Sequence, residues 1–412
     1  MGIRQRGYPG GEQLAVLQMH CEHARYVYNL GLEHRKLAYL HKKSYGHRPG
    51  YRDRHPGSSF AAQSKLLTEA RQEFDWLREG STVVQQAALR DLDRAFTNFF
   101  EGRSQFPTFR SGRDPRQGFV VRDVTVVRLN KNWAAITAPK AGRVRFRLSR
   151  PWKSVKAASS ARLTFQNNQW HVALTTPPRG KINAEATAAP IGIDRGVANT
   201  VATSDSEFFQ APGLSGGECR RFVASQRKLS RQRKGSRRRE ATKAKLSVLR
   251  QRLNDRRREW IEQTTTELAL RHSAIAIEKL ATANMVRRPK PKPDPDSPGN
   301  YLPNGAAAKA ALNKAILASC WGKFAERLSD KTDVIEVPAY NTSRRCHSCG
   351  HIDKRNRESQ AEFRCVECGN SGHADVHAAM NIYELAFGEL ETCRRTGGLW
   401  TTATAAVNQQ AA

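Results

Sequence analysis

Residues 191–196 read Ile-Gly-Ile-Asp-Arg-Gly, a short apolar run that ends in an acid and a glycine. Short apolar runs bounded by turn residues are typical of buried strands. A second run, Ala-Ile-Ala-Ile-Glu at 274–278, also ends in a carboxylate. A third acid, Asp375, opens a helix expected over 375–390. The pattern predicts an α/β domain whose strand ends present acids.

Three carboxylates in such positions suit hydrolysis of a phosphodiester. Two divalent ions about 4 Å apart can clamp the attacking and leaving oxygens, and Mg²⁺ prefers hard carboxylate oxygens. A single Asp after a strand is more often a turn or helix cap, so the interpretation depends on the three acids together. The candidate ligands are Asp194, Glu278 and Asp375.

Four cysteines form two CxxC pairs with fifteen residues between the pairs. This spacing is typical of a tetrahedral zinc site, and four thiolates leave no open position for chemistry. We expect a structural zinc held by Cys346, Cys349, Cys365 and Cys368. The nearby histidines are interpreted as contacts to solvent or phosphate: His347, His351 and His373.

Strong positive charge predicts a polyanionic partner. The chain has 69 Lys and Arg against 38 Asp and Glu, a formal charge of +31, and each neutralised phosphate releases counterions. A basic ribosomal or chromatin-type protein is the alternative, but 412 residues suggest several domains with real cores. Residues 220–258 are the most basic stretch. The expected nucleic-acid contacts are Arg227, Lys228, Arg231, Arg233, Lys234, Arg237, Arg238, Arg239, Arg344 and Arg345.

Three features predict a soluble intracellular protein, and we expect it in the bacterial cytoplasm, associated with the nucleoid. No apolar run approaches the roughly 20 residues that span a bilayer. The first six residues lack the apolar centre of a signal peptide. Cysteines outside the CxxC pairs are scattered, which suits a reducing compartment.

The first part of the chain combines helical and strand patterns. Apolar residues recur at helical spacing over 12–42 and 60–100, whereas short β-favouring runs with turn signals follow Gly102. We expect a β-barrel from 1–11 and 104–180, with residues 12–103 inserted as a helical domain. One strand is predicted over 154–164, and Asn167-Asn168 as a hairpin turn.

The second part is assigned to the acid-bearing domain, 181–343 and 370–412, with a zinc ribbon over 344–369. Long helices over 218–271 are expected to break at Gly235-Ser236. Five prolines within 285–300 predict a mobile loop and a candidate lid. One helix is expected over 306–329, and the tail beyond Trp400 is expected to be disordered.

These motifs resemble a known family. Segments 191–196, 277–280 and 375–382 resemble the three segments of a RuvC-like nuclease, a fold of the RNase H type. The cysteine region, preceded by Val-Pro-Ala-Tyr-Asn-Thr-Ser at 337–343, is similar to the insertion in TnpB. TnpB proteins are transposon-encoded RNA-guided DNA nucleases, similar to the ancestors of compact type V CRISPR effectors. Shorter matches are Arg-Tyr-Val-Tyr-Asn at 25–29, Phe-Pro-Thr-Phe at 106–109 and Trp-Gly-Lys-Phe at 321–324.

The resemblance implies that the three acids are catalytic and bind Mg²⁺ or Mn²⁺. It implies a guide RNA that pairs with double-stranded target DNA, a short adjacent motif read by protein, and cleavage at a single RuvC-like site. The barrel would be a wedge domain, 12–103 a recognition domain, and the ribbon a loader of target nucleic acid. We expect one protein chain per ribonucleoprotein.

The sequence departs from the family in three places. The family often has Asn where this chain has His377, and a hydrophobic residue where it has Arg195. Residues 260–263, Trp-Ile-Glu-Gln, lack the usual His-Lys pair. All three acids are present, so the departures affect RNA contacts more than the nuclease, and His377 is interpreted as a bystander.

Other functions are weighed against this one. A guide-free nuclease such as a junction resolvase would not need the long N-terminal region or the +31 charge. An RNA-guided repressor without cleavage is opposed by the intact acids. A transposase would have to join strands, and nothing beyond the acids suggests such a site. Transposon and CRISPR origins both stay open.

Overall fold

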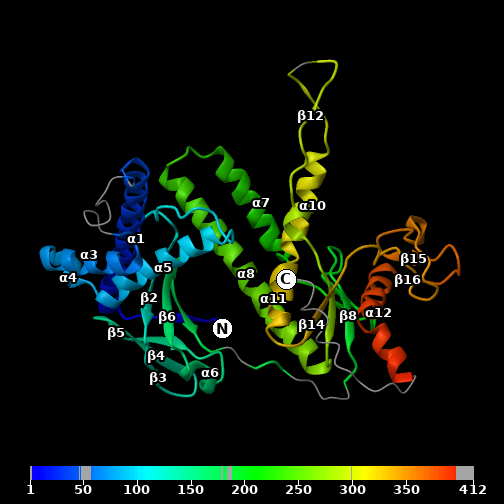
Figure 1. The fold of residues 1–412 in the computed structure, drawn as a ribbon, viewed down its shortest axis with the longest axis horizontal. Coiled ribbons are helices and arrows are strands. Elements are labelled where there is room, and N and C mark those ends of the chain that lie inside the picture. Colours follow the sequence, from blue (N-terminus) through cyan, green and yellow to red (C-terminus); the bar gives the residue numbers. More distant parts are fainter. Residues whose placement is uncertain are drawn as a thin grey trace. The chain divides into compact units, whose positions relative to one another are not determined.

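The computed structural model describes residues 2–45, 47, 57–177, 180–182, 188–297 and 299–395 (Figure 1). The chain divides into two compact units, 1–179 and 180–412. None of the helices within the described ranges has the length and apolarity that a membrane crossing needs. The prediction of disorder beyond Trp400 falls outside the described residues.

The first unit contains a seven-stranded antiparallel sheet. Strand β1 lies between β5 and β7, pairing Gly7 with Phe146 and Gly2 with Thr175. The pairing expected for the N-terminal strand is therefore confirmed, while the wedge assignment stays a prediction. In spatial order the strands are β2 (Arg116–Arg122), β6 (Ser160–Gln166), β7 (Gln169–Thr175), β1 (Gly2–Tyr8), β5 (Gly142–Arg147), β4 (Trp133–Ala138) and β3 (Val126–Arg128).

The two edge strands of this sheet, β2 and β3, are joined directly by residues 123–125. In the described part of the chain, no ladder pairs these two strands. Three residues span at most about 11 Å, so the sheet must curl to bring its edges together. Asp123 turns the chain there with a φ of 52°, and the predicted Asn167-Asn168 hairpin turn is confirmed by φ values of 52° and 59°.

The strand predicted over 154–164 is wrong in its first part. Helix α6 occupies Trp152–Lys156, directly after Pro151, and β6 begins at Ser160. Proline with its fixed φ favours the start of a helix. The side chain of Val155 is fully buried. A buried apolar residue here belongs to a single helical turn, although the same pattern is also typical of a strand.

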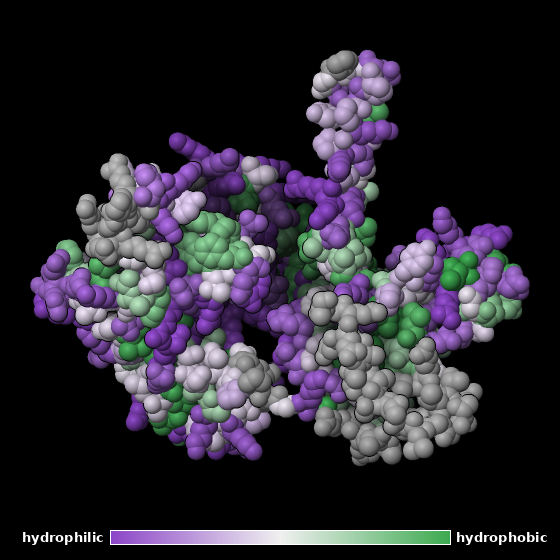
Figure 2. Space-filling model, in the orientation of Figure 1, coloured by the Kyte–Doolittle hydropathy of each residue, from purple (hydrophilic) through white to green (hydrophobic). Residues whose placement is uncertain are grey.

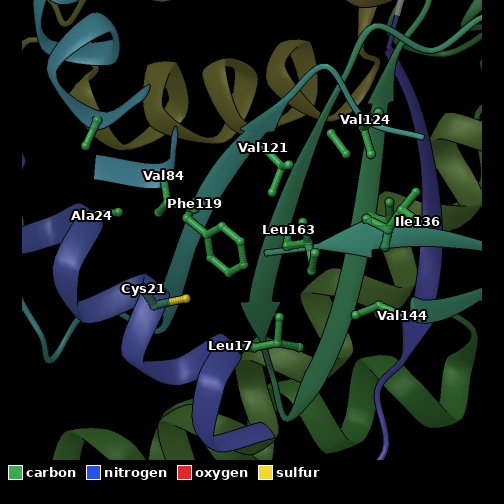
Figure 3. Close-up of a cluster of buried hydrophobic side chains, with 14 of the residues drawn as sticks. Leu17, Cys21, Ala24, Val84, Phe119, Val121, Val124, Ile136, Val144 and Leu163 are labelled. Carbon is green, nitrogen blue, oxygen red and sulfur yellow. The ribbon is translucent and has the colours of Figure 1, made fainter. Parts of the chain in front are cut away.

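The helices of the first unit are α1 (Gly11–Tyr45), α3 (Phe60–Glu73), α4 (Asp75–Glu79) and α5 (Thr82–Phe100). Helices α1 and α5 pack on strand β2 of the sheet, whereas α3 packs on α5 and α4. Leu17, Cys21 and Ala24 share one face of α1 through three- and four-residue spacing. Figure 3 shows them in the same cluster as Phe119 and Leu163 of the sheet. The helices and the sheet therefore share one hydrophobic core.

The second unit is built on a five-stranded mixed sheet. Strands β8, β11 and β14 are parallel, whereas β9 is antiparallel to both of its neighbours, β8 and β10. In spatial order they are β10 (Phe208–Phe209), β9 (Val201–Thr203), β8 (Ile191–Asp194), β11 (Ile275–Glu278) and β14 (Val334–Val337). The mixed α/β architecture agrees with the sequence prediction.

Helices cover both faces of this sheet. Ile193 and Ile277 pack with residues of α8 (Arg237–Arg271) and α11 (Trp321–Ser329). Ala276, whose side chain points the opposite way, packs with Ile382 of α12 (Ala374–Arg395). Helix α12 therefore lies on the face opposite to α8 and α11.

Two basic helices form a hairpin before β11. Helix α7 (Gly216–Arg231) begins with a capping box between Ser215 and Glu218, and α8 follows at Arg237. The predicted break is confirmed, because Gly235 has a φ of 84° between them. Such a backbone conformation is readily adopted by glycine.

Between residues 285 and 329 the structure contradicts the single helix and adds a short ladder to the predicted loop, whose mobility and role as a lid stay predictions. The proline-rich stretch forms a small hairpin, in which β12 (Lys292–Pro293) pairs with β13 (Tyr301–Leu302) after helix α9 (Thr282–Met285). Its surface is largely hydrophilic (Figure 2). The helix predicted over 306–329 is divided into α10 (Ala306–Ala318) and α11, because Cys320 adopts a left-handed φ of 59°.

Candidate carboxylate site and cysteine ribbon

The register of β8 and β11 places two acids at one edge of the sheet. Ile193 lies opposite Ile277 in a parallel ladder, and Asp194 and Glu278 are the next residues. Both isoleucines point to the α8 face. Because side chains alternate along a strand, the two carboxylates point to the opposite face, where α12 lies.

A close contact between α12 and β8 brings the third acid to the same place. A Cβ on Gly192 would lie 2.2 Å from the backbone oxygen of Ala379, so the helix can approach only a glycine there. Asp375 lies one helical turn before Ala379. Its Oδ2 accepts a hydrogen bond at 3.0 Å from Asn199 Nδ2, in the turn after β8. The structure thus gathers the three predicted acids.

The acids affect one another's ionisation. Burial, followed by the charges of Glu278 and Asp375, raises the pKa of Asp194 to about 8. Burial also raises the pKa of Glu278, against the effects of Thr342, Arg195 and Arg357. Clustered carboxylates of this kind favour a hard divalent cation, which stabilises their charged forms. The donor set therefore fits Mg²⁺ or Mn²⁺.

Polar groups from three other segments hold the acids. The hydroxyl of Thr342 donates to Glu278 Oε1, and the buried guanidinium of Arg195 donates to the Glu278 backbone oxygen. Arg357 Nη2 lies 3.2 Å from Asp375 Oδ1. Sequence reasoning gave Thr342, Arg357 and Asn199 no role at the acids. Thr342 lies within the motif at 337–343, and Asn199 lies three residues after the motif at 191–196. This proximity is the one signal in the sequence that could have indicated them.

The four predicted cysteines come together in the ribbon between β14 and α12. Their sulfur atoms all lie within 4.8 Å of one another, and among the described residues no other group of three or more His, Cys, Asp or Glu comes this close. Two separations are 3.7 Å for Cys346–Cys368 and 3.6 Å for Cys349–Cys365. This cluster can hold a zinc ion.

The ribbon backbone forms two similar turns around the cysteines. The N–H of Gly350 donates to Cys346 O at 2.8 Å, and that of Gly369 donates to Cys365 O at 3.0 Å. Both glycines have positive φ, 76° and 70°. A short hairpin of β15 (Glu362–Arg364) and β16 (Ser371–His373) continues the ribbon to His373, beyond residue 369.

Two of the histidines that are predicted to contact solvent or phosphate also have partners inside the protein, while the predicted contacts stay predictions. His347 Nδ1 lies 3.0 Å from His377 Nδ1, and His373 Nδ1 accepts from the Asp375 backbone N–H at 3.2 Å. The ring of His377 stacks on Phe363 with centroids 4.2 Å apart. His377 therefore packs α12 against the ribbon, and its interpretation as a bystander stays a prediction.

Most of the predicted nucleic-acid contacts are exposed on the α7–α8 hairpin or the ribbon. Two differ. The Arg239 guanidinium donates to the backbone oxygens of Leu229 and Gln232, so it holds the turn between α7 and α8. Arg345 lies 3.8 Å from Glu384 in an ion pair. The exposed residues are Arg227, Lys228, Arg231, Arg233, Lys234, Arg237, Arg238 and Arg344.

Two family models match separate parts of the chain. Residues 171–288 match the OrfB/IS605 model, described as "Probable transposase". Residues 321–382 match the TNB domain of Cas12f1-like proteins. The first match contains β8 and β11 with their acids, and the second contains the ribbon and the start of α12.

Relatives match over nearly the whole chain. The "Putative RNA-guided DNA endonuclease InsQ" of Escherichia coli (strain K12) is 30% identical over 381 residues, which are 91% of this chain and 89% of that protein. A "Putative RNA-guided DNA endonuclease" of Streptomyces pristinaespiralis is 28% identical over 92% of this chain and 88% of its own. A Cas12f1–sgRNA–target DNA complex shares the fold, with a TM-score of 0.52, 15% identity, and coverage of 89% of this chain and 81% of that one. The chain therefore belongs to the OrfB/IS605, or TnpB, family, whose fold is shared by compact type V CRISPR effectors.

Proposed function

We propose that this chain is an RNA-guided DNA endonuclease that cleaves target DNA at one site formed by Asp194, Glu278 and Asp375. The observation that carries the proposal is the convergence of these acids on the α12 side of the sheet. Relatives named as RNA-guided DNA endonucleases support the guide and the substrate.

The second unit is assigned a RuvC-like fold of the RNase H type. A mixed sheet in which three parallel strands are extended by the antiparallel pairs β8–β9 and β9–β10, with helices on both faces, supports this assignment. The cysteine ribbon between β14 and α12 is assigned to target loading. In the first unit, the sheet is assigned to the wedge domain and residues 12–103 to recognition.

The acids would hold Mg²⁺ or Mn²⁺, which supplies charge stabilisation and an activated water when bound. Asn199 and Arg357 keep the Asp375 carboxylate in place, and Thr342 does the same for Glu278. The four cysteines would bind a structural zinc, since four sulfurs within 4.8 Å of one another can supply the four ligands of a tetrahedral zinc site.

Base pairing between guide and target would carry the sequence specificity, while protein side chains grip the backbone. Exposed arginines and lysines of the α7–α8 hairpin suit this role, because phosphate contacts release counterions. Bacterial relatives and a DNA substrate support a location in the bacterial cytoplasm.

The test begins with expression of the chain together with its native genomic flanks, followed by sequencing of the RNA that copurifies. One abundant RNA with a fixed scaffold and a variable end is expected. Mapping that end to a transposon boundary or to a CRISPR array decides the origin. Heterogeneous RNA in a preparation that still cuts DNA would replace the proposal with a guide-free nuclease.

Asp194→Ala separates cleavage from binding. Cleavage is expected to be lost, while affinity for RNA and target DNA is kept, because the acid contributes to the chemical step. Cutting at the wild-type rate would remove Asp194 from the site. Guided binding by the wild-type protein without cleavage, in saturating Mg²⁺, would favour a repressor.

A further inference from the structure

We propose that Thr342 is a positioning residue for Glu278, and that Asn381 fixes Thr342 by binding the backbone at the entrance to the cysteine ribbon. The inference rests on the proposed function, because it assigns Thr342 and Asn381 to the support of that nuclease site. It joins a carboxylate on β11, a loop residue and a residue of α12 in one buried chain of hydrogen bonds.

The first link is the hydrogen bond that the hydroxyl of Thr342 donates to Glu278 Oε1. The two residues are 3% and 7% exposed, so water does not compete freely for this contact. A hydroxyl has one proton to donate. Its other acceptor, the backbone oxygen of Ala339, lies farther away at 3.3 Å. The proton is therefore assigned to the carboxylate of Glu278.

The second link is the side-chain amide of Asn381, which is fully buried. Its Nδ2 donates to Thr342 O at 2.8 Å and to Arg345 O at 2.7 Å. An amide nitrogen has two protons, and both are used here. Because Cys346 follows Arg345, one side chain of α12 fixes the backbone that leads into the ribbon.

Glu278 gains from this support because it ends a four-residue strand. Its backbone oxygen is held by Arg195, which leaves the side chain to be oriented by Thr342. A carboxylate held in one rotamer loses less conformational entropy when it binds a cation. Removing the hydroxyl should therefore weaken cation binding without changing the ligand set.

A purely local role for Thr342 is the competing explanation. Its hydroxyl could serve only to close the turn onto Ala339 O, in which case its loss would lower stability and leave cation binding unchanged. Thr342→Val removes the hydroxyl with little change of shape, and Thr342→Ser keeps it. This pair distinguishes positioning from packing.

The experiment is a calorimetric Mn²⁺ titration of each ribonucleoprotein without target DNA, with Asp194→Ala as the reference for a disrupted site. For Thr342→Val we expect an approximately tenfold weaker affinity for Mn²⁺, or about 1.4 kcal/mol. Thr342→Ser should stay within about twofold of wild type. Wild-type affinity in Thr342→Val would overturn the proposal. If the valine variant does not fold, Thr342→Ala against Thr342→Ser makes the same comparison.

Asn381→Leu tests the second link. Alone it should weaken Mn²⁺ binding as Thr342→Val does, and the double variant should be no weaker than either single one, since both interrupt one chain. Additive losses would overturn the role of Asn381. A wild-type ribonucleoprotein that binds Mn²⁺ but never cuts guided DNA would reject the proposed function and leave the positioning intact.

Discussion

Arg357 of the cysteine ribbon and Asp375 of α12 form an ion pair, with Nη2 3.2 Å from Oδ1. The Asp375 side chain is 6% exposed and that of Arg357 is 27% exposed. The arginine charge also opposes the rise in pKa that burial causes at Asp194 and Glu278. The ribbon thus has two roles, because it contains the cysteine cluster and also supplies a positive charge to the carboxylate site.

Replacing Arg357 should destabilise the protein most when Mg²⁺ is absent. Arg357→Gln leaves three clustered acids with less compensating charge, and removing one partner of a buried pair is unfavourable. We expect the melting temperature to fall by about 2–6 °C in Mg²⁺-free buffer near pH 8. Saturating Mg²⁺ should remove most of this difference. Thermal unfolding with and without Mg²⁺ measures both values.

The matched control is Arg355→Gln in the same ribbon. Arg355 pairs with Asp353, but its side chain is 76% exposed, and exposed pairs contribute little. Its melting temperature should stay at the wild-type value in both buffers. An equal loss for Arg357→Gln with and without Mg²⁺ would contradict a role in charge compensation.

The raised pKa of Asp194 predicts how stability depends on pH. Its ordinary value is 3.8, and burial with neighbouring acids raises the folded value to about 8. Between these values the folded protein holds a proton that the unfolded chain has released, so the free energy of unfolding falls as pH rises. Above the folded pKa the acid is ionised in both states and the fall ends.

Asp194→Asn removes this dependence. In Mg²⁺-free buffer the variant should equal wild type near pH 4 and exceed its unfolding free energy near pH 8 by about 5 kcal/mol, because each unit of the pKa shift is equivalent to about 1.4 kcal/mol. Urea denaturation at the two pH values provides the measurement. Parallel pH profiles for the two proteins would show that Asp194 titrates normally.

Cys349→Ser should release the zinc. Zinc content is expected to fall from about one ion per chain to near zero, with a lower melting temperature, because three thiolates bind zinc far more weakly than four. Elemental analysis of purified protein gives the stoichiometry. Cys219→Ser is the control, since Cys219 is an exposed free thiol outside the cluster. Full zinc content in Cys349→Ser would exclude this ligand set.

The α7–α8 hairpin should account for part of the salt dependence of target binding. The variant Arg227→Gln/Arg231→Gln/Arg238→Gln removes three exposed charges. Each lost duplex-phosphate contact lowers the slope of log affinity against log salt by about 0.9. Binding measured over a series of salt concentrations therefore should show a clearly shallower slope.

A second triple variant has the same change in net charge but removes cations that already have acidic partners. Lys243, Arg258 and Lys323 pair with Glu240, Asp255 and Glu326. Changing these three to Gln should leave the slope near its wild-type value. Equal slopes for the two triple variants would show that net charge alone governs binding.

The positions of the acids and cysteines could be predicted because their signals are local. Alternation in 191–194 and 275–278 fixes which face each side chain takes, and cysteine spacing is read directly from the chain. The contact of Thr342 with Glu278 bridges 64 residues, and that of Arg357 with Asp375 bridges 18. Such contacts depend on how the ribbon folds back, which no local pattern specifies.

The departures from prediction between residues 285 and 329 have local causes as well. Cys320 takes a left-handed φ inside a continuous helical pattern, a conformation usually left to glycine. Prolines at 293 and 295 disfavour a long strand because they have no backbone N–H to donate. A ladder of two residues needs few such donors and can still form. The composition of a segment indicates only which structures it disfavours on average. The break at Cys320 and the ladder at Pro293 depend on the conformations of individual residues.

The central place of β1 bears on how the first unit folds during synthesis. Both neighbours of β1 lie at least 134 residues later in the chain, at 142–147 and 169–175. At about 5–20 residues per second, β1 waits roughly 10–30 seconds for its partners to leave the ribosome. Pairings so distant in sequence form slowly. During that interval the helices between them can assemble, while the unpaired edges of β1 are free to bind a chaperone or another nascent chain.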